Sequence, residues 1–257
     1  MNAAELYIAF QTILVKEIRR FTRIWAQTLL PPAITTGLYF VIFGTLIGKR
    51  IGSMGGIDYI QFVVPGLIMM AVITSAYGNV VSSFFGNKFQ HSIEELLVAP
   101  VPNWIILVGY VAGGVARGIC IGVVVTLLSL FFTDMHVQHW GVTIAVVTLT
   151  AILFSLAGLI NAIYAKSFDD ISIIPTFVLT PLTYLGGVFY SIELLPVFWQ
   201  YVSKANPIFY MVNAFRYGVL GTSDVHMTSA ITMICIFIAL AAVFSLHLLN
   251  KSGGLRN

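Results

Sequence analysis

Six long stretches of this sequence lack, or nearly lack, ionised side chains, and this limits the possible folds more than any other feature. Residues 24–48, 59–87, 135–165, 171–192 and 225–250 contain no Asp, Glu, Lys or Arg, and 96–133 contains only Arg117. An ionised side chain at the centre of a bilayer costs several kcal/mol, so uncharged stretches of this length predict membrane spans. Each reaches the roughly 20 residues that a helix needs to cross about 30 Å of hydrocarbon.

We therefore predict an all-α integral membrane protein, a single domain over 1–257 with six transmembrane helices. The predicted spans are 25–48, 59–87, 104–132, 141–165, 171–190 and 228–250. Only 9% of the residues are charged and 58% are hydrophobic, whereas a water-facing domain carries about 25% charged residues. A transmembrane barrel would need alternating apolar and polar positions, which these continuously apolar stretches do not offer.

The basic residues predict the orientation, because Lys and Arg near span ends stay on the cytoplasmic side. If both termini lie in the cytoplasm, eight cations lie on the cytoplasmic side, namely Lys16, Arg19, Arg20, Arg23, Lys88, Lys166, Lys251 and Arg256. Four remain outside, namely Lys49, Arg50, Lys204 and Arg216. We expect a multi-pass membrane protein with both termini in the cytoplasm. The net charge of +3 is too small for a phosphate-binding stripe, so nucleic acid is not an expected partner.

Residues 4–24 have the pattern of an amphipathic helix that lies in the membrane interface. Its apolar residues fall on one arc, and Lys16, Arg19, Arg20 and Arg23 fall on the opposite arc. The basic face would contact anionic headgroups, so membrane lipids are expected partners. Glu17 breaks the pattern, because it projects into the apolar arc. It is either a snorkelling carboxylate beside a neighbouring cation such as Arg19 or Arg20, or a buried ion pair that fixes this helix.

A separate short helix is predicted at 92–100, between the second and third spans. Ser92 followed by Glu95 is typical of a capping box, and Pro100 and Pro102 end the helix. Exposed apolar residues in the middle of this helix indicate either a docking surface for another protein or a helix that lies on the membrane.

Several motifs together resemble the permease subunits of ABC type-2 exporters, in particular inner-membrane transport permeases of enterobacteria. These motifs are YIQFVVPGLIMM at 59–70, FFGNK at 84–88, IEELLVAP at 93–100, PLTYLGGVFY at 181–190, Leu195-Pro196, and Asn206-Pro207 with Arg216. The resemblance covers nearly the whole chain and implies that the protein lies in a bacterial inner membrane. It implies a coupling helix that contacts a cytoplasmic ABC ATPase through Ser92, Glu94, Glu95, Leu96, Leu97 and Pro100. It also implies a complex of two permease copies with two ATPase subunits.

The sequence offers no route to nucleotide binding by this chain. Its one Gly-Lys dipeptide, Gly48-Lys49, is followed by Arg50 and lacks the spacing of a phosphate-binding loop. We expect no cofactor or metal on this chain, with ATP and Mg²⁺ bound by the partner ATPase. The expected function is ATP-driven export of an apolar or amphipathic substrate such as a drug, lipid or glycolipid. An integral membrane enzyme and a passive channel are the alternatives, but catalytic groups and rings of polar pore residues are scarce.

The third span holds a row of glycines and one intramembrane cation. Gly109, Gly113, Gly114, Gly118 and Gly122 are typical of close helix packing. Arg117 either snorkels toward the cytoplasm or pairs with a carboxylate or with backbone carbonyls. Candidate residues for the pathway are Phe40, Phe43, Met69, Met70 and Phe177, although such residues more often pack helices than recognise a substrate.

The segment 191–222 is too long for a turn and too apolar for a solvated loop. Asn206-Pro207 divides it, because Pro207 can open a new helix while the residue before it leaves helical geometry. We predict an extracellular re-entrant hairpin of two short helices, with Leu195, Pro196, Asn206 and Pro207 in an outer gate. The alternative is an ordinary periplasmic loop.

Overall fold

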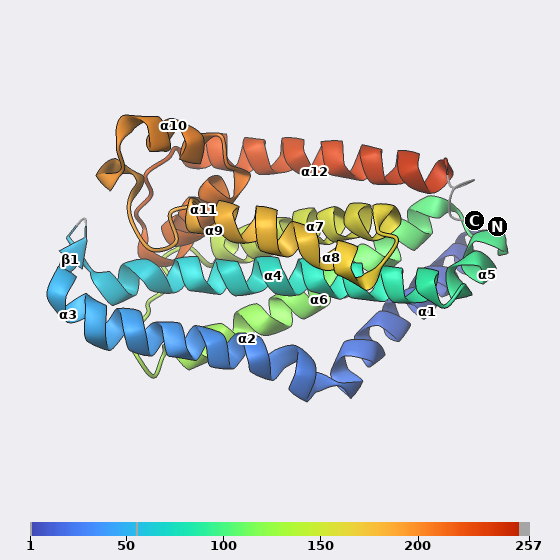
Figure 1. Ribbon diagram of the computed structural model, residues 1–257, viewed down its shortest axis with the longest axis horizontal. Helices are drawn as coiled ribbons and strands as arrows, with labels where there is room; N and C mark the ends of the chain where they lie inside the picture. The colour runs from blue at the N-terminus through green and yellow to red at the C-terminus, as the bar shows by residue number, and fades with distance from the viewer. Residues whose placement is uncertain (1, 55, 252–257) are drawn as a thin grey trace.

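The computed structural model describes residues 2–54 and 56–251 as an elongated helical bundle (Figure 1). The first part of the chain forms α1 (Ala3–Arg23), α2 (Trp25–Tyr39), a π-helix η1 (Phe40–Ile47), α3 (Gly48–Ile51), and strands β1 (Ser53–Met54) and β2 (Ile57–Asp58). The middle forms α4 (Tyr59–Phe89), α5 (Ser92–Val98), α6 (Asn103–Ser129) and α7 (Trp140–Tyr164). The last part forms α8 (Phe168–Ile174), η2 (Pro175–Leu179), α9 (Thr180–Tyr184), η3 (Ile192–Leu194), α10 (Val197–Lys204), α11 (Pro207–Leu220) and α12 (Met227–Asn250).

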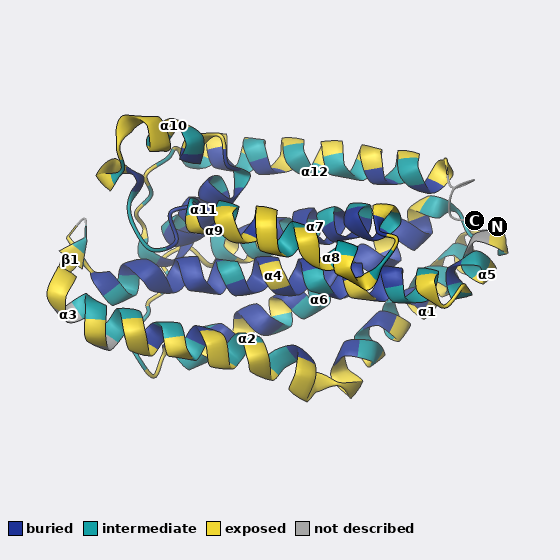
Figure 2. Ribbon diagram, in the orientation of Figure 1, coloured by how far each residue is buried: buried dark blue, intermediate teal, exposed yellow. Residues whose placement is uncertain are grey.

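The centre of the bundle is α4, which packs against α6, α7 and α11. It is buried along most of its length, while α2 and α12 lie at the periphery with exposed apolar faces (Figure 2). Apolar side chains exposed on both outer helices are what a surrounding bilayer requires. The short strands β1 and β2 pair antiparallel, with Ser53 opposite Asp58, and join α3 to α4.

Five helices in the described residues are long and apolar enough to cross a membrane, at Trp25–Gly44, Tyr59–Phe89, Asn103–Ser129, Trp140–Tyr164 and Met227–Asn250. The predicted fifth span, 171–190, is not among them. Three short consecutive segments, α8, η2 and α9, occupy part of this stretch, and the helix ends at Tyr184. Pro175 and Pro181 interrupt the regular hydrogen bonding, and Gly187 adopts a left-handed conformation with φ of 72°.

Small residues on α6 let its neighbours approach closely. A side chain at Gly113 would lie 2.5 Å from Cβ of Glu17 on α1, and one at Gly109 would lie 2.6 Å from Ile13. On another side of α6, Gly118 and Gly122 face α4. A Cβ added at Gly118 would lie 3.1 Å from Ala76, and one added at Gly122 would lie 3.1 Å from Val72. The glycine row thus holds α1 and α4 against α6, which confirms the predicted packing role.

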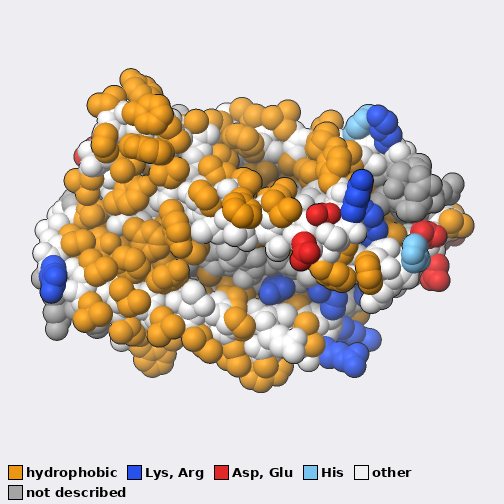
Figure 3. Space-filling model, in the orientation of Figure 1, with side chains coloured by type: hydrophobic (Ala, Val, Ile, Leu, Met, Phe, Trp, Pro, Cys, Tyr) orange, Lys and Arg blue, Asp and Glu red, His pale blue; other side chains and the backbone are white. Residues whose placement is uncertain are grey.

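The two ends of the bundle differ in charge. The helix α1 begins and α12 ends at the same end of the molecule, where α5 also lies (Figure 1). Charged side chains gather at this end, which we call the basic end, whereas most of the remaining surface in this view is apolar (Figure 3). The described cations of the basic end are Lys16, Arg19, Arg20, Arg23, Lys88, Lys166 and Lys251. Arg256, which was counted with them, lies outside the described residues.

Candidate functional site

The carboxylate of Glu17 is fully buried where α1 crosses α4 and α6. Its Oε1 accepts a hydrogen bond of 2.6 Å from the hydroxyl of Ser83, and its Oε2 lies 3.5 Å from Nε of Arg20. Arg20 in turn donates to the backbone oxygen and to Oδ1 of Asn79, each at 2.8 Å. The carboxylate therefore does not snorkel. The buried carboxylate and the half-buried Arg20 together fix α1 against α4, because removing Arg20 would leave the buried charge of Glu17 uncompensated.

Asn87, near the end of α4, connects four helices at the basic end. Its Oδ1 accepts a hydrogen bond of 3.2 Å from Nζ of Lys16 on α1. Its Nδ2 contacts the hydroxyl of Tyr110 on α6 at 2.6 Å. The hydroxyl of Ser92, the first residue of α5, donates to the backbone oxygen of Asn87 at 3.2 Å. Sequence reasoning missed Asn87, because an amide inside an uncharged span gives no local signal of the partners that folding brings to it.

A short helix, α5, lies where the coupling helix is predicted; it begins at Ser92 as predicted, but it is shorter and its N-terminus is capped differently. It ends at Val98, because Ala99 is extended before Pro100, so both residues lie outside it. The capping box predicted at Ser92 and Glu95 is wrong. His91 occupies the cap position in a left-handed conformation, its Nδ1 lies 3.0 Å from Glu94, and Ser92 bonds back to Asn87 instead.

The two faces of α5 have different surroundings. Ile93 is buried and anchors the helix to the bundle, and Leu96 is half-buried against the core. Glu95 is exposed and Val98 is 72% exposed, so they form the outward side; the side chain of Leu97 lies outside the described residues. An isolated seven-residue helix would not persist in water, so the anchor at Ile93 is what makes α5 a defined surface.

Lys88 ties the loop after α7 to the end of α4. Its Nζ donates to the backbone oxygens of Ile163 and Ala165, at 2.6 and 2.8 Å. These carbonyls lie at the C-terminus of α7, where a cation is favoured by the helix dipole. The short turn from α4 to α5 is therefore held between α1, α6 and α7.

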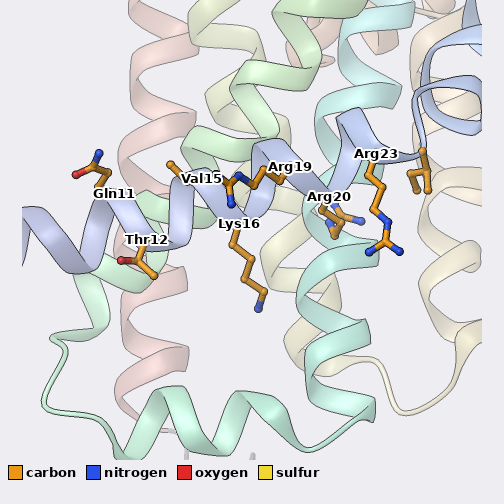
Figure 4. A pocket seen from close by; sticks show the side chains of 8 residues that line it. Gln11, Thr12, Val15, Lys16, Arg19, Arg20 and Arg23 are labelled. Atoms are coloured by element: carbon orange, nitrogen blue, oxygen red, sulfur yellow. The ribbon is translucent and has the colours of Figure 1, made fainter.

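The outer side of α1 borders a hollow of about 920 Å³ (Figure 4). Its lining residues are Gln11, Thr12, Val15, Lys16, Arg19, Arg20, Arg23 and Ile24. No acidic side chain is among them, and this face of α1 attracts anions.

Arg117 is half-buried on α6, and its Nη2 donates to the backbone oxygen of Thr28 at 3.3 Å. Of the two alternatives for this cation, the structure therefore shows a backbone carbonyl as partner. The contact joins α6 to the first turn of α2.

Arg216, which the orientation count assigns to the outer side of the membrane, is buried inside the protein. It donates to the backbone oxygens of Gly187 at 2.7 Å and Phe62 at 3.4 Å, and its guanidinium lies 3.8 Å from the centre of the Phe62 ring. Asn213 supplies a further acceptor at 3.3 Å. The residue joins α11, α4 and the loop after α9. Backbone carbonyls carry no sequence signature, so the sequence could not reveal these partners.

The segment predicted as an outer gate forms two short helices, α10 and α11, which meet at Asn206-Pro207. Asn206 caps α11 by accepting a hydrogen bond from the backbone N–H of Ile208, and its Nδ2 donates to Leu182. Leu195 and Pro196 lie between η3 and α10. Much of α10 is exposed and apolar, at Val197, Phe198, Trp199 and Tyr201.

The five candidate pathway residues do not come together. Phe40 and Met69 are buried in the core, and Phe40 packs against Phe132 with ring centres 5.5 Å apart. Phe43 packs against Phe189, whereas Phe177 is 73% exposed on η2. Met70 is half-buried beside the core.

Comparisons with known proteins agree with this architecture. A model of the ABC-2 type transporter family matches residues 8–220. The inner membrane transport permease YadH of Escherichia coli K12 is 58% identical over 251 residues, which cover 98% of this chain and 98% of that protein. Nodulation protein J of Rhizobium leguminosarum bv. viciae is 25% identical over 215 residues, which cover 83% of each chain.

Proposed function

This chain belongs to the ABC-2 type transporter family, and from that premise we propose that it is the permease subunit of an ATP-driven exporter. Its family and its apolar helices make it a multi-pass transport permease of an inner membrane. The proposal adds the direction of transport, the partner and the point where the partner binds. A separate cytoplasmic ABC ATPase binds ATP and Mg²⁺, and its movements reach this chain through α5.

The observation that carries the proposal is the anchored helix α5 with an outward apolar and acidic side. Ile93 fixes the helix to the bundle, while Glu95 and Val98 point away from it. Ser92 and Asn87 connect α5 to α4, and Lys16 and Tyr110 connect the same asparagine to α1 and α6. Force applied at α5 would therefore act on three long helices together, as a rigid lever requires.

The remaining features fit this proposal. In this proposal the interrupted helix from α8 to α9 acts as a shortened sixth span, so both termini share one side. The cations at the basic end support the cytoplasm as that side, together with α5. The helices α10 and α11 form a re-entrant hairpin in the outer leaflet and act as an outer gate. Two permeases and two ATPases form the working unit, and the sparsely polar spans suit an apolar or amphipathic substrate.

Co-purification with the ATPase tests the proposal, with Val98→Arg as the key variant. Val98 is exposed, so the substitution should leave the permease folded while a charge at the centre of the interface abolishes recovery of the ATPase. Leu96→Arg is less decisive because Leu96 also contacts the core. Phe131→Arg, at an 85% exposed residue after α6, is the matched control and should retain the ATPase. Normal recovery with Val98→Arg would overturn the assignment of α5.

A further inference from the structure

The four cations on the outer side of α1 differ in what they bind. Arg20 is held by Asn79 and Glu17. Lys16 makes one hydrogen bond, to Asn87. Arg19 and Arg23 are exposed, and within residues 2–54 and 56–251 neither side chain makes a hydrogen bond or an ion pair. Lys16, Arg19 and Arg23 follow one another at helical spacing, so their charges lie along one row.

This row borders the 920 Å³ hollow, whose lining contains no carboxylate. Figure 4 shows Lys16 and Arg23 extending from the same side of α1. Guanidinium groups bind phosphate oxygens in a bidentate manner, and a second guanidinium one turn away can hold the same group. The hollow is therefore suited to an anion with several oxygens.

An apolar row begins where the cations end. Ile24 lines the hollow and is 40% exposed, and α2 begins at the exposed Trp25. Leu30, Ile34 and Leu38 continue along one side of α2 at intervals of four residues, each exposed. These side chains lead away from the cations along the first membrane span.

From this juxtaposition we propose that the hollow binds one anionic phospholipid, with its phosphate between Arg19 and Arg23 and its acyl chains along α2. Lys16 contributes a third positive charge to the same headgroup. The inference requires only that α2 spans a membrane, so it does not depend on coupling to an ATPase. It differs from a general attraction to anionic membranes because it predicts one defined site on α1.

An acidic protein segment would satisfy the cations but would leave the exposed row on α2 unused. A phospholipid satisfies both, because it carries a phosphate at one end and hydrocarbon at the other. The change from cations to apolar side chains occurs within two positions, from Arg23 to Trp25. This spacing matches the boundary between headgroup and acyl chain at a membrane interface.

Native mass spectrometry of the purified full-length permease tests the site, with phosphatidylglycerol and phosphatidylcholine titrated separately. Because each Lys or Arg near an anionic surface contributes a factor of about five, Arg19→Gln/Arg23→Gln should weaken phosphatidylglycerol binding roughly twenty-five-fold. Phosphatidylcholine binding should stay unchanged. The matched control, Arg50→Gln/Lys204→Gln, removes two exposed cations elsewhere and should change neither lipid.

Three results would overturn the proposal. Wild-type affinity for phosphatidylglycerol in Arg19→Gln/Arg23→Gln would show that the cations do not form the site. Full displacement of the lipid by millimolar glycerol phosphate would show that the hollow binds a soluble anion and not a lipid. Loss of the ATPase from this variant with unchanged lipid binding would identify the face as a protein interface.

Discussion

At the residue scale, the position of α1 depends on glycines that accept its side chains. Gly113 receives Glu17 and Gly109 receives Ile13, so any added methyl group must displace the helix. The sequence revealed the glycine row and the odd position of Glu17, but not that the two meet. Their contact joins residues far apart in the chain, and neither helical periodicity nor composition can predict such a pairing.

Gly113→Ala should therefore destabilise the permease, because the new Cβ would lie 2.5 Å from Cβ of Glu17. Overpacking of this kind costs about 1–3 kcal/mol. Thermal unfolding of the detergent-solubilised protein measures the change. Gly78→Ala is the matched control, since nothing lies within 4 Å of its added Cβ, and it should be neutral or slightly stabilising. Equal unfolding temperatures for the two variants would contradict the packing of α1.

At the element scale, charge and proline determined which helices could be predicted. The uncharged stretches predicted helices close to α4, α6, α7 and α12, because ionised residues mark the two ends of each stretch. The stretch 171–190 was also uncharged, yet Pro175, Pro181 and Gly187 interrupt it. The start of α5 at Ser92 was predicted correctly, but its capping box was wrong, because Ser92 bonds back to Asn87 and His91 supplies the turn.

Cysteine labelling tests whether α10 lies in the membrane. Phe198 and Tyr201 are each 69% exposed, so the protein itself does not shield them. Phe198→Cys and Tyr201→Cys should resist a membrane-impermeant reagent added from outside but react with a permeant one, because lipid covers them. Leu194→Cys and Tyr210→Cys, toward the ends of the segment, should react with both reagents. Uniform reaction with the impermeant reagent would identify an ordinary periplasmic loop.

At the scale of the whole molecule, the proposed function places an ATPase on the outward side of α5 and pairs two copies of the permease. Closed symmetric dimers are the commonest oligomers of identical subunits. We predict that the native mass of the detergent-solubilised complex corresponds to two permeases and two ATPase subunits. A mass that corresponds to one permease with one ATPase would contradict the dimer.

The central claim is that a separate ATPase drives this chain through α5, and photocrosslinking at Val98 tests it most directly. A photoreactive amino acid placed at Val98 in intact membranes should form a covalent product that contains the ABC ATPase, because this side chain points away from the bundle. The same amino acid at Phe131, also exposed, should give no such product. Crosslinking of Val98 to lipid alone would contradict the claim and would show that α5 lies on the membrane surface.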